Sequence, residues 1–251
     1  MRSLPLTFVA ALCVLALAAP AALARSIAQP HVVVAVVDSG VTPSKQLAGR
    51  LVPGWDFVDN DATPTDGFGH GTELAGIVAA QCPKCLIMPV RVLGNGGLGQ
   101  VPAVVKGIQY AVAHGAQVVN LSMTTPYDSP DLSAAIEWAV GQGVSVTVAA
   151  GNAGASTAFP GVETPNAIVV GSVDAAGKLF SWSNHGPWVD VFAPGTLKSR
   201  SLEGKVVSAT GTSASAAFVA GRAGDLLACN ASLTPASVSQ QLQVSLTAPS
   251  C

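Results

Sequence analysis

From residue 32 onward the chain alternates short apolar runs with longer segments whose apolar residues recur at helical spacing. Uninterrupted apolar runs favour strands buried on both faces, and they cover Val32–Asp38, Leu86–Leu93, Gln117–Met123, Val144–Ala150, Ala167–Val173 and Val189–Phe192. The segments between them predict helices over Thr72–Gln81, Val101–His114, Leu132–Gly141, Ser213–Leu227 and Pro235–Leu246. Such alternation is typical of right-handed crossovers onto a parallel sheet. We expect one doubly wound α/β domain with three layers, α/β/α, and a mainly parallel central sheet.

The first residues of the chain have the pattern of an export signal. Arg2 supplies a positive start, an apolar stretch runs from Leu6 to Ala19, and Ala22-Leu23-Ala24 forms a small-residue cleavage site. The apolar stretch is short for a membrane span of about 20 residues, so a retained anchor is the weaker alternative. We expect residues 1–24 to be a signal peptide and residues 25–251 to be an exported domain, secreted or periplasmic, that does not contact the membrane after cleavage.

The composition predicts a large core and excludes some partners. Of the 251 residues, 49% are hydrophobic and 10% are charged, whereas an average protein has about a quarter charged residues. The net charge is −2 and no run of lysine or arginine occurs. Nucleic acid and acidic membrane surfaces are therefore poor candidates for partners.

The cysteines fit an oxidising compartment. Cleavage of the leader would remove Cys13 and leave Cys82, Cys85, Cys229 and Cys251, an even number in an exported chain. The simplest arrangement is two local disulfides, one joining Cys82 to Cys85 and one joining Cys229 to Cys251. A four-cysteine zinc site is the alternative, because Cys-x-x-Cys is half of such a site.

Three residues with catalytic chemistry stand at the ends of predicted elements. Ser213 begins a helix of small and apolar residues, Asp38 ends the first apolar strand, and His70 precedes an apolar helix. Taken singly, these residues could be a helix cap, a turn residue and a structural histidine. Taken together, they supply a nucleophile, a general base and a residue that orients the base, at the positions where an α/β sheet gathers reactive groups.

The chain resembles the subtilases, the subtilisin-like serine peptidases, in four ordered motifs. These are Val37-Asp38-Ser39-Gly40, Gly69-His70-Gly71-Thr72, Ala149-Ala150-Gly151-Asn152 and Gly211-Thr212-Ser213. The segment from Gly54 to Asp61 is most similar to the thermitase branch, and the resemblance covers roughly residues 31 to 246. It implies a subtilisin-like fold and an endopeptidase acting on polypeptides. Asp38, His70 and Ser213 would form its triad, and Asn152 would bind the oxyanion.

A glycine-rich segment admits two interpretations. Gly94-Asn95-Gly96-Gly97-Leu98-Gly99 fits the dinucleotide-binding pattern G-x-G-x-x-G, but no acidic residue occurs between Gly99 and Asp128 to bind a ribose. We therefore expect no organic cofactor. The resemblance implies instead that Gly97, Leu98 and Gly99 form an extended edge that pairs with the substrate.

The resemblance also implies an opposite edge and a primary pocket. Ser122, Met123 and Thr124 would form that edge, and Ala149, Ala150 and Gly151 the apolar walls of the pocket. Relatives often carry glycine at the position of Thr124. We therefore expect the pocket to be narrowed and to disfavour large aromatic side chains on the acyl side of the scissile bond.

An acidic loop is a candidate structural calcium site. Carboxylate and hydroxyl oxygens are suitable calcium ligands, and the resemblance places the ion on Asp56, Asp59, Asp61, Thr63 and Thr65. The alternative is a solvated acidic loop.

Several departures from the family keep a second class of function open. After Ser213 the helix lacks the Met, Pro and His that most subtilases carry, and Glu73 stands where most carry His. A catalytically weak or inactive peptide-binding scaffold is therefore the alternative, and an esterase is a weaker one. Little sequence separates the leader from the domain, so we expect no propeptide: either the enzyme matures without one, or a separate chain inhibits it or assists its folding. We expect a monomer.

Overall fold

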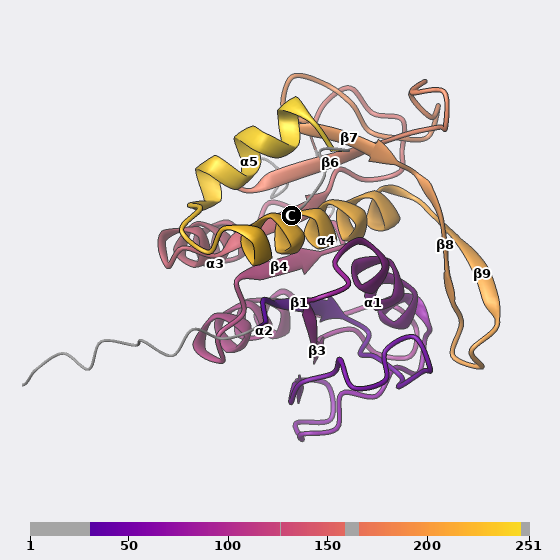
Figure 1. Ribbon diagram of the computed structural model, residues 1–251, viewed down its shortest axis with the longest axis vertical. Helices are drawn as coiled ribbons and strands as arrows, with labels where there is room; N and C mark the ends of the chain where they lie inside the picture. The colour runs from indigo at the N-terminus through magenta and orange to yellow at the C-terminus, as the bar shows by residue number, and fades with distance from the viewer. Residues whose placement is uncertain (1–30, 126, 159–165, 247–251) are drawn as a thin grey trace, which may run out of the picture. The chain divides into compact units, whose positions relative to one another are not determined.

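The computed structural model describes residues 31–125, 127–158 and 166–246, which belong to one compact unit that begins at His31. Their core is a seven-stranded parallel sheet (Figure 1), as the alternating pattern predicts. Its strands, in spatial order, are β2 (Trp55–Asp56), β3 (Leu86–Arg91), β1 (Val33–Asp38), β4 (Val118–Leu121), β5 (Ser145–Ala149), β6 (Ile168–Val173) and β7 (Val191–Pro194). The predicted leader lies outside the described residues.

The order of the strands reverses at β1. Beyond β1 the chain builds β2 and β3 on one side and then crosses to build β4 to β7 on the other. In doubly wound sheets the crevice at such a reversal, at the carboxyl ends of the strands, is where ligands bind. Asp38 is the last residue of β1, so it lies at this crevice.

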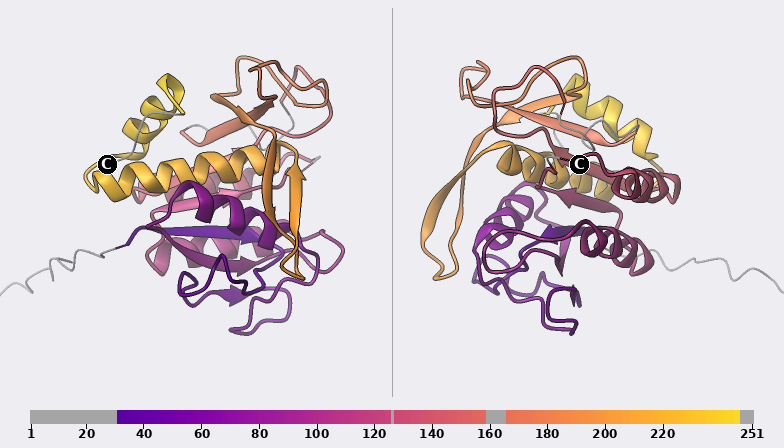
Figure 2. Two further views of the ribbon diagram at one scale, coloured as in Figure 1. Left: turned by 45° about the vertical axis from the view of Figure 1, so that its right-hand side comes forward. Right: turned by 180° about the vertical axis from the view of Figure 1, so that it is seen from behind.

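Helices cover both faces of the sheet. On one face α1 (His70–Gln81), α4 (Thr212–Cys229) and α5 (Pro235–Val244) enclose one apolar cluster, and on the other α2 (Val101–Ala113) and α3 (Pro130–Gly141) enclose a second. The right view of Figure 2 shows the molecule from behind the view of Figure 1, so the two together show the layers from opposite sides. The doubly wound three-layer fold is therefore confirmed. None of the helices in the described ranges is both long and apolar enough to cross a bilayer.

Helix α4, which carries Ser213 in its first turn, approaches α1 and the sheet closely. A Cβ atom on Gly221 would lie 2.9 Å from the carbonyl oxygen of Val78, and one on Gly224 would lie 2.7 Å from Cys85 Sγ. Glycine at both positions is what allows the helix to sit this near its neighbours. The second half of α4 is thus held by close contacts with α1 and with the segment at Cys85.

Three strands were not predicted from the pattern. β8 (Thr196–Arg200) and β9 (Val206–Thr210) form an antiparallel ribbon that runs beside α1 and leads into α4 (Figure 2). Its residues are largely polar or exposed, so no apolar run marks it. β2 is only two residues long, which is too short for an apolar run to reveal it.

The connection after α1 is held by a disulfide and a guanidinium. Cys82 and Cys85 are disulfide-bonded, which confirms the first predicted pair and excludes these cysteines as zinc ligands. Arg50 donates to the carbonyl oxygens of Ala79 and Cys85 at 2.8 to 3.1 Å and also to that of Cys82. Cys251 lies outside the described residues, so its pairing with Cys229 stays a prediction.

We expect Arg50→Lys to lower the free energy of unfolding by about 2 kcal/mol, because an ammonium cannot span three carbonyls as the planar fork does. For a domain of this size the melting temperature should fall by roughly 4–8 °C. Lys84→Ala is the matched control, since it removes an exposed cation from the same connection. Thermal unfolding followed by circular dichroism measures both variants, and an equal loss in the two would contradict the role of Arg50.

Candidate active site

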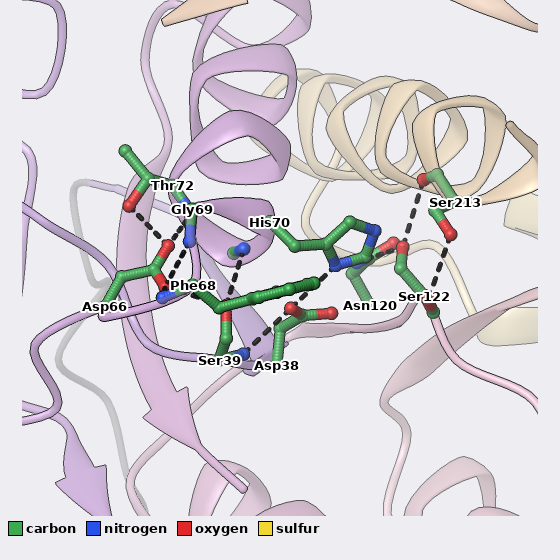
Figure 3. A network of polar contacts seen from close by, with 11 residues as sticks. Asp38, Ser39, Asp66, Phe68, Gly69, His70, Thr72, Asn120, Ser122 and Ser213 are labelled. Atoms are coloured by element: carbon green, nitrogen blue, oxygen red, sulfur yellow. Dashed lines mark hydrogen bonds and ion pairs between the residues drawn. The ribbon is translucent and has the colours of Figure 1, made fainter. Parts of the chain in front are cut away.

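Asp38 and His70, two members of the predicted triad, meet at the sheet crevice. His70 is the first residue of α1, and its Nδ1 lies 2.8 Å from Asp38 Oδ1 (Figure 3). Asp38 is fully buried, and its Oδ1 also accepts from the Ser39 backbone N–H at 2.8 Å. A buried carboxylate bonded to Nδ1 orients the imidazole and leaves Nε2 to face the substrate.

A second buried carboxylate, Asp66, fixes the start of α1. Its two oxygens accept from the backbone N–H groups of Phe68, Gly69 and Thr72 at 2.8 to 2.9 Å. Asp66 also accepts from the Ser39 hydroxyl, whose oxygen accepts from the Gly71 N–H, so the turn after Asp38 and the helix of His70 are linked. The sequence analysis assigned Asp66 no role. The signal available was an acidic residue shortly before a helix start, where anions bind unpaired N–H groups.

Ser213 lies in the first turn of α4 and is not its cap. The N-cap residue is Gly211, and no side chain caps this helix end. Ser213 Oγ donates to the Ser122 carbonyl oxygen at 3.0 Å, and no hydrogen bond joins it to His70 in the described part of the chain. Figure 3 shows the Ser213 hydroxyl bonded to Ser122 and the His70 imidazole bonded to Asp38. In this structure the Ser213 hydroxyl is therefore bonded to Ser122 and not to the imidazole.

Asn152 is oriented by the residue before the nucleophile. Its Oδ1 accepts from both the backbone N–H and the hydroxyl of Thr212, at 2.9 and 3.0 Å. The Thr212 hydroxyl in turn accepts from the Gly151 N–H at 3.0 Å. With Oδ1 occupied in this way, the amide NH₂ group is the end of Asn152 left to donate to a ligand.

One pocket of about 280 Å³ brings these residues together. It is lined by Phe68, His70, Leu93, Gly97, Ser122, Met123, Thr124, Ala149, Gly151, Asn152, Thr212 and Ser213. No sequence pattern had indicated a role in the site for Phe68 or Leu93, and Thr212 was expected only as part of the Ser213 motif. Phe68 has 48% of its surface exposed, and its ring centroid lies 6.4 Å from that of His70. An exposed aromatic ring beside a histidine has no periodic signal in the sequence, so only the fold reveals it.

Three residues predicted to bind substrate do not line this pocket. Leu98 is 82% exposed at the tip of the glycine-rich turn, and Gly99 packs against the Val92 carbonyl oxygen. Ala150 is fully buried in the core between the sheet and the α2 and α3 layer. The alternation of side chains along an extended segment explains why Ala149 and Ala150 face opposite sides.

The carboxylates proposed for calcium bind other groups of the protein in this structure. Asp56 Oδ2 and Asp59 Oδ2 lie 2.6 and 2.5 Å from an Arg91 nitrogen, and Asp56 Oδ1 accepts from two backbone N–H groups. Asp61 Oδ1 accepts from the Thr63 N–H, and the Thr65 N–H donates to the Thr63 carbonyl. In the described ranges, no three His, Cys, Asp or Glu side chains are grouped to hold a metal. Asp56 and Asp59 pair with a guanidinium that is distant in the sequence, and the calcium site stays a prediction.

Burial and neighbouring charges act in opposite directions on His70. Burial lowers the pKa of the imidazole, but Asp38, Glu73 and Asp66 raise it, and the net pKa lies above its ordinary value. Burial raises the pKa of Glu73, and the nearby His70 lowers it. The imidazolium formed when His70 takes a proton is thus stabilised by carboxylates on more than one side.

A buried Asp–His pair, a serine at a helix N-terminus and an amide donor around one pocket define the class of serine hydrolases. Comparison with known proteins identifies the family within this class. The profile of the subtilase family, Peptidase_S8, matches residues 29–248. Thermitase from Thermoactinomyces vulgaris is 42% identical over 203 residues, which are 76% of this chain and 73% of that protein.

Two further relatives agree. Thermophilic serine proteinase from Bacillus sp. (strain AK1) is 39% identical over 76% of this chain, which spans half the length of that relative. The crystal structure of a cold adapted subtilisin-like serine proteinase superposes with a TM-score of 0.81 at 35% identity, covering 85% of this chain and 81% of that one. The chain belongs to the subtilase family, whose enzymes are serine endopeptidases.

Proposed function

We propose that this protein is an exported serine endopeptidase that cleaves polypeptides through an acyl-enzyme on Ser213. The observation that carries the proposal is the 2.8 Å contact between His70 Nδ1 and Asp38 Oδ1 beside a pocket that also contains Ser213 and Asn152. Export is supported by the leader pattern of the sequence and by the Cys82–Cys85 disulfide, since disulfides persist in oxidising compartments.

Acylation begins with proton transfer. His70 Nε2 takes the Ser213 hydroxyl proton as Oγ attacks the carbonyl carbon of the scissile peptide, and Asp38 stabilises the resulting imidazolium. The carbonyl oxygen becomes negative and faces the Asn152 NH₂ group and the Ser213 backbone N–H. Collapse of this intermediate breaks the C–N bond, and the imidazolium gives its proton to the leaving amine.

Deacylation repeats these steps with water. His70 Nε2 removes a proton from a water molecule that attacks the ester carbonyl, and the same donors face the oxyanion. Breaking the ester bond returns the proton to Ser213 Oγ and releases the new carboxyl terminus. The two halves of the reaction thus use the same residues.

The inactive-scaffold alternative has one observation in its favour, the bond from Ser213 Oγ to Ser122 rather than to His70. Catalytic hydrogen bonds in ligand-free sites are often formed only when substrate binds. The departures after Ser213 leave α4 intact, because Ala214, Ala216 and Ala217 are buried in the core beside the sheet. Complete catalytic chemistry in an intact frame therefore favours the endopeptidase.

The experiment for this proposal is digestion of an unfolded protein, with the new termini identified by mass spectrometry. An endopeptidase produces internal cuts, and the side chain of Thr124 on the pocket wall should disfavour large aromatic residues on the acyl side. A scaffold would leave the substrate intact under conditions in which a subtilisin degrades it.

The raised pKa of His70 predicts the pH dependence. The base must be neutral, so kcat/KM should be lost as the pH falls through a pKa above the ordinary 6.5. Glu73→Gln removes a charge that raises this pKa and should move the acidic limb to lower pH. Glu137→Gln, on the opposite face in α3, is the control and should leave the limb in place. A limb that moves to higher pH in Glu73→Gln would contradict the assignment.

A further inference from the structure

Two fully buried polar side chains lie on the face of the sheet that α4 covers. Asn120 on β4 and Thr147 on β5 are directly opposite each other in the parallel register. Their neighbours Val118 and Val119 alternate between the two cores, which places Asn120 on the α4 side of the sheet. Buried polar groups are costly unless they are hydrogen-bonded, so their bonds indicate what they are there for.

The hydrogen bonds form a chain that ends on Ser213, and Figure 3 shows its part from Asn120 to Ser213. Thr147 Oγ1 donates to Asn120 Oδ1 at 3.2 Å, and Asn120 Nδ2 donates to Ser122 Oγ at 2.9 Å. Ser122 Oγ donates to the Ser213 carbonyl oxygen at 3.0 Å, and Ser213 Oγ donates back to the Ser122 carbonyl oxygen at 3.0 Å. Ser122 thus holds both the backbone and the hydroxyl of Ser213.

The chain has a direction, because each hydroxyl has one proton. The Thr147 proton turns the oxygen of the Asn120 amide toward β5 and leaves the NH₂ group facing Ser122. The Ser122 oxygen accepts from that group, so its own proton is free for Ser213. If the amide turned over, Ser122 would donate to the amide oxygen and the Ser213 carbonyl would lose its donor.

We propose that Thr147 and Asn120 are positioning residues that act through Ser122 to hold Ser213 in register with the substrate-binding edge at residues 122–124. The proposal rests on the proposed function of Ser213 as nucleophile. Neither residue lines the pocket, so breaking the chain changes the geometry of attack and not the binding of substrate. A displacement of about 1 Å at a reacting group can cost up to 100-fold in rate.

The first test compares two replacements of one residue. Thr147→Val keeps the shape and removes the hydroxyl, and it should lower kcat about 10-fold with KM within about twofold of wild type. Thr147→Ser keeps the hydroxyl and should restore kcat to within about twofold. Ser172→Ala is the matched control. Ser172 on β6 also bonds to α4, because its Oγ lies 2.8 Å from Ser215 Oγ, but it lies outside the chain of bonds that leads to Ser213. It should lower the melting temperature and leave kcat unchanged.

The second test asks whether Thr147 acts through Ser122. Ser122→Ala should lower kcat at least as much as Thr147→Val, and the double variant should be no worse than Ser122→Ala alone. Additive losses, or a kcat loss in Ser172→Ala equal to that in Thr147→Val, would overturn the proposal. If Thr147→Val does not fold, the kcat of Ser122→Ala against Ser172→Ala decides, and equal values would overturn it.

The rate of inactivation by a fluorophosphonate separates this proposal from the proposed function. The reagent reads the reactivity of Ser213 without peptide turnover, and Thr147→Val should slow it about 10-fold relative to Thr147→Ser. Wild-type labelling without peptide cleavage would contradict the endopeptidase and leave the positioning comparison intact. Equal labelling rates in the two Thr147 variants would overturn the positioning role even in an active peptidase.

Discussion

Ser213→Ala should lower kcat for a peptide substrate by about 10⁵- to 10⁶-fold, because covalent catalysis is lost and only the binding groups and oxyanion donors remain. KM should change little, since Ser213 is one of twelve residues that line the pocket. Steady-state hydrolysis of a fluorogenic peptide measures both constants. The melting temperature should stay close to that of wild type, because Ser213 does not cap α4.

The companion variant is His70→Ala. Because base and nucleophile act as one unit, the double variant Ser213→Ala/His70→Ala should be no slower than either single variant. A Ser213→Ala enzyme that keeps more than about a hundredth of wild-type kcat would show that another group is the nucleophile. Residual wild-type enzyme in the variant sample is measured by active-site titration. Mixtures of wild type and variant at known ratios calibrate this measurement.

Asn152→Leu should lower kcat by roughly 10²- to 10³-fold with KM nearly unchanged, the range known for removing one such donor from a subtilisin. The reason is that Asn152 is held by Thr212 with its NH₂ group free for a charge that develops only in the transition state. The measurement is again kcat and KM, now with an amide and an ester of the same acyl group.

The control for Asn152 lies one step back. Thr212→Ser retains the hydroxyl that orients the amide and should keep kcat within about threefold of wild type, whereas Thr212→Val removes it and should lower kcat about 10-fold. A rise in KM with kcat unchanged for Asn152→Leu would mean that this amide binds substrate in the ground state. That outcome would remove Asn152 from the oxyanion site.

The elements with strong apolar patterns could be predicted from the sequence. The apolar run at residues 32–38 is β1 from Val33 to Asp38, and the small-residue helix predicted from Ser213 is α4 from Thr212. Both are determined by local hydrophobicity, because they are buried on nearly all sides. The ribbon of β8 and β9 carries no such pattern, because most of its residues are polar or at least partly exposed to solvent.

The candidate site residues that lie in short sequence motifs could be predicted from the sequence. Asp38, His70, Asn152 and Ser213 each lie in a motif, and the structure places all four around the same crevice. Roles that depend on a distant partner were not predictable. Arg91 forms ion pairs with the carboxylates of Asp56 and Asp59, which lie more than 30 positions away in the sequence, and no local pattern indicates that pairing.

Asp66 and the chain of bonds below Ser213 show the same limit. Asp66 was visible as one acidic residue among several, but its bonds to the start of α1 exist only once the loop closes. Asn120 interrupts an apolar strand, and Thr147 does so less visibly because threonine suits strands. Each is a weak local exception, and their meaning comes from the register that places them opposite each other.

The most direct test of the whole account is to label the intact enzyme with a fluorophosphonate and map the adduct by mass spectrometry over a range of pH. One adduct on Ser213 is predicted, with a rate that rises with pH as His70 loses its proton and that collapses in His70→Ala. Labelling at another residue, or an undiminished rate in His70→Ala, would contradict the assignment of nucleophile and base.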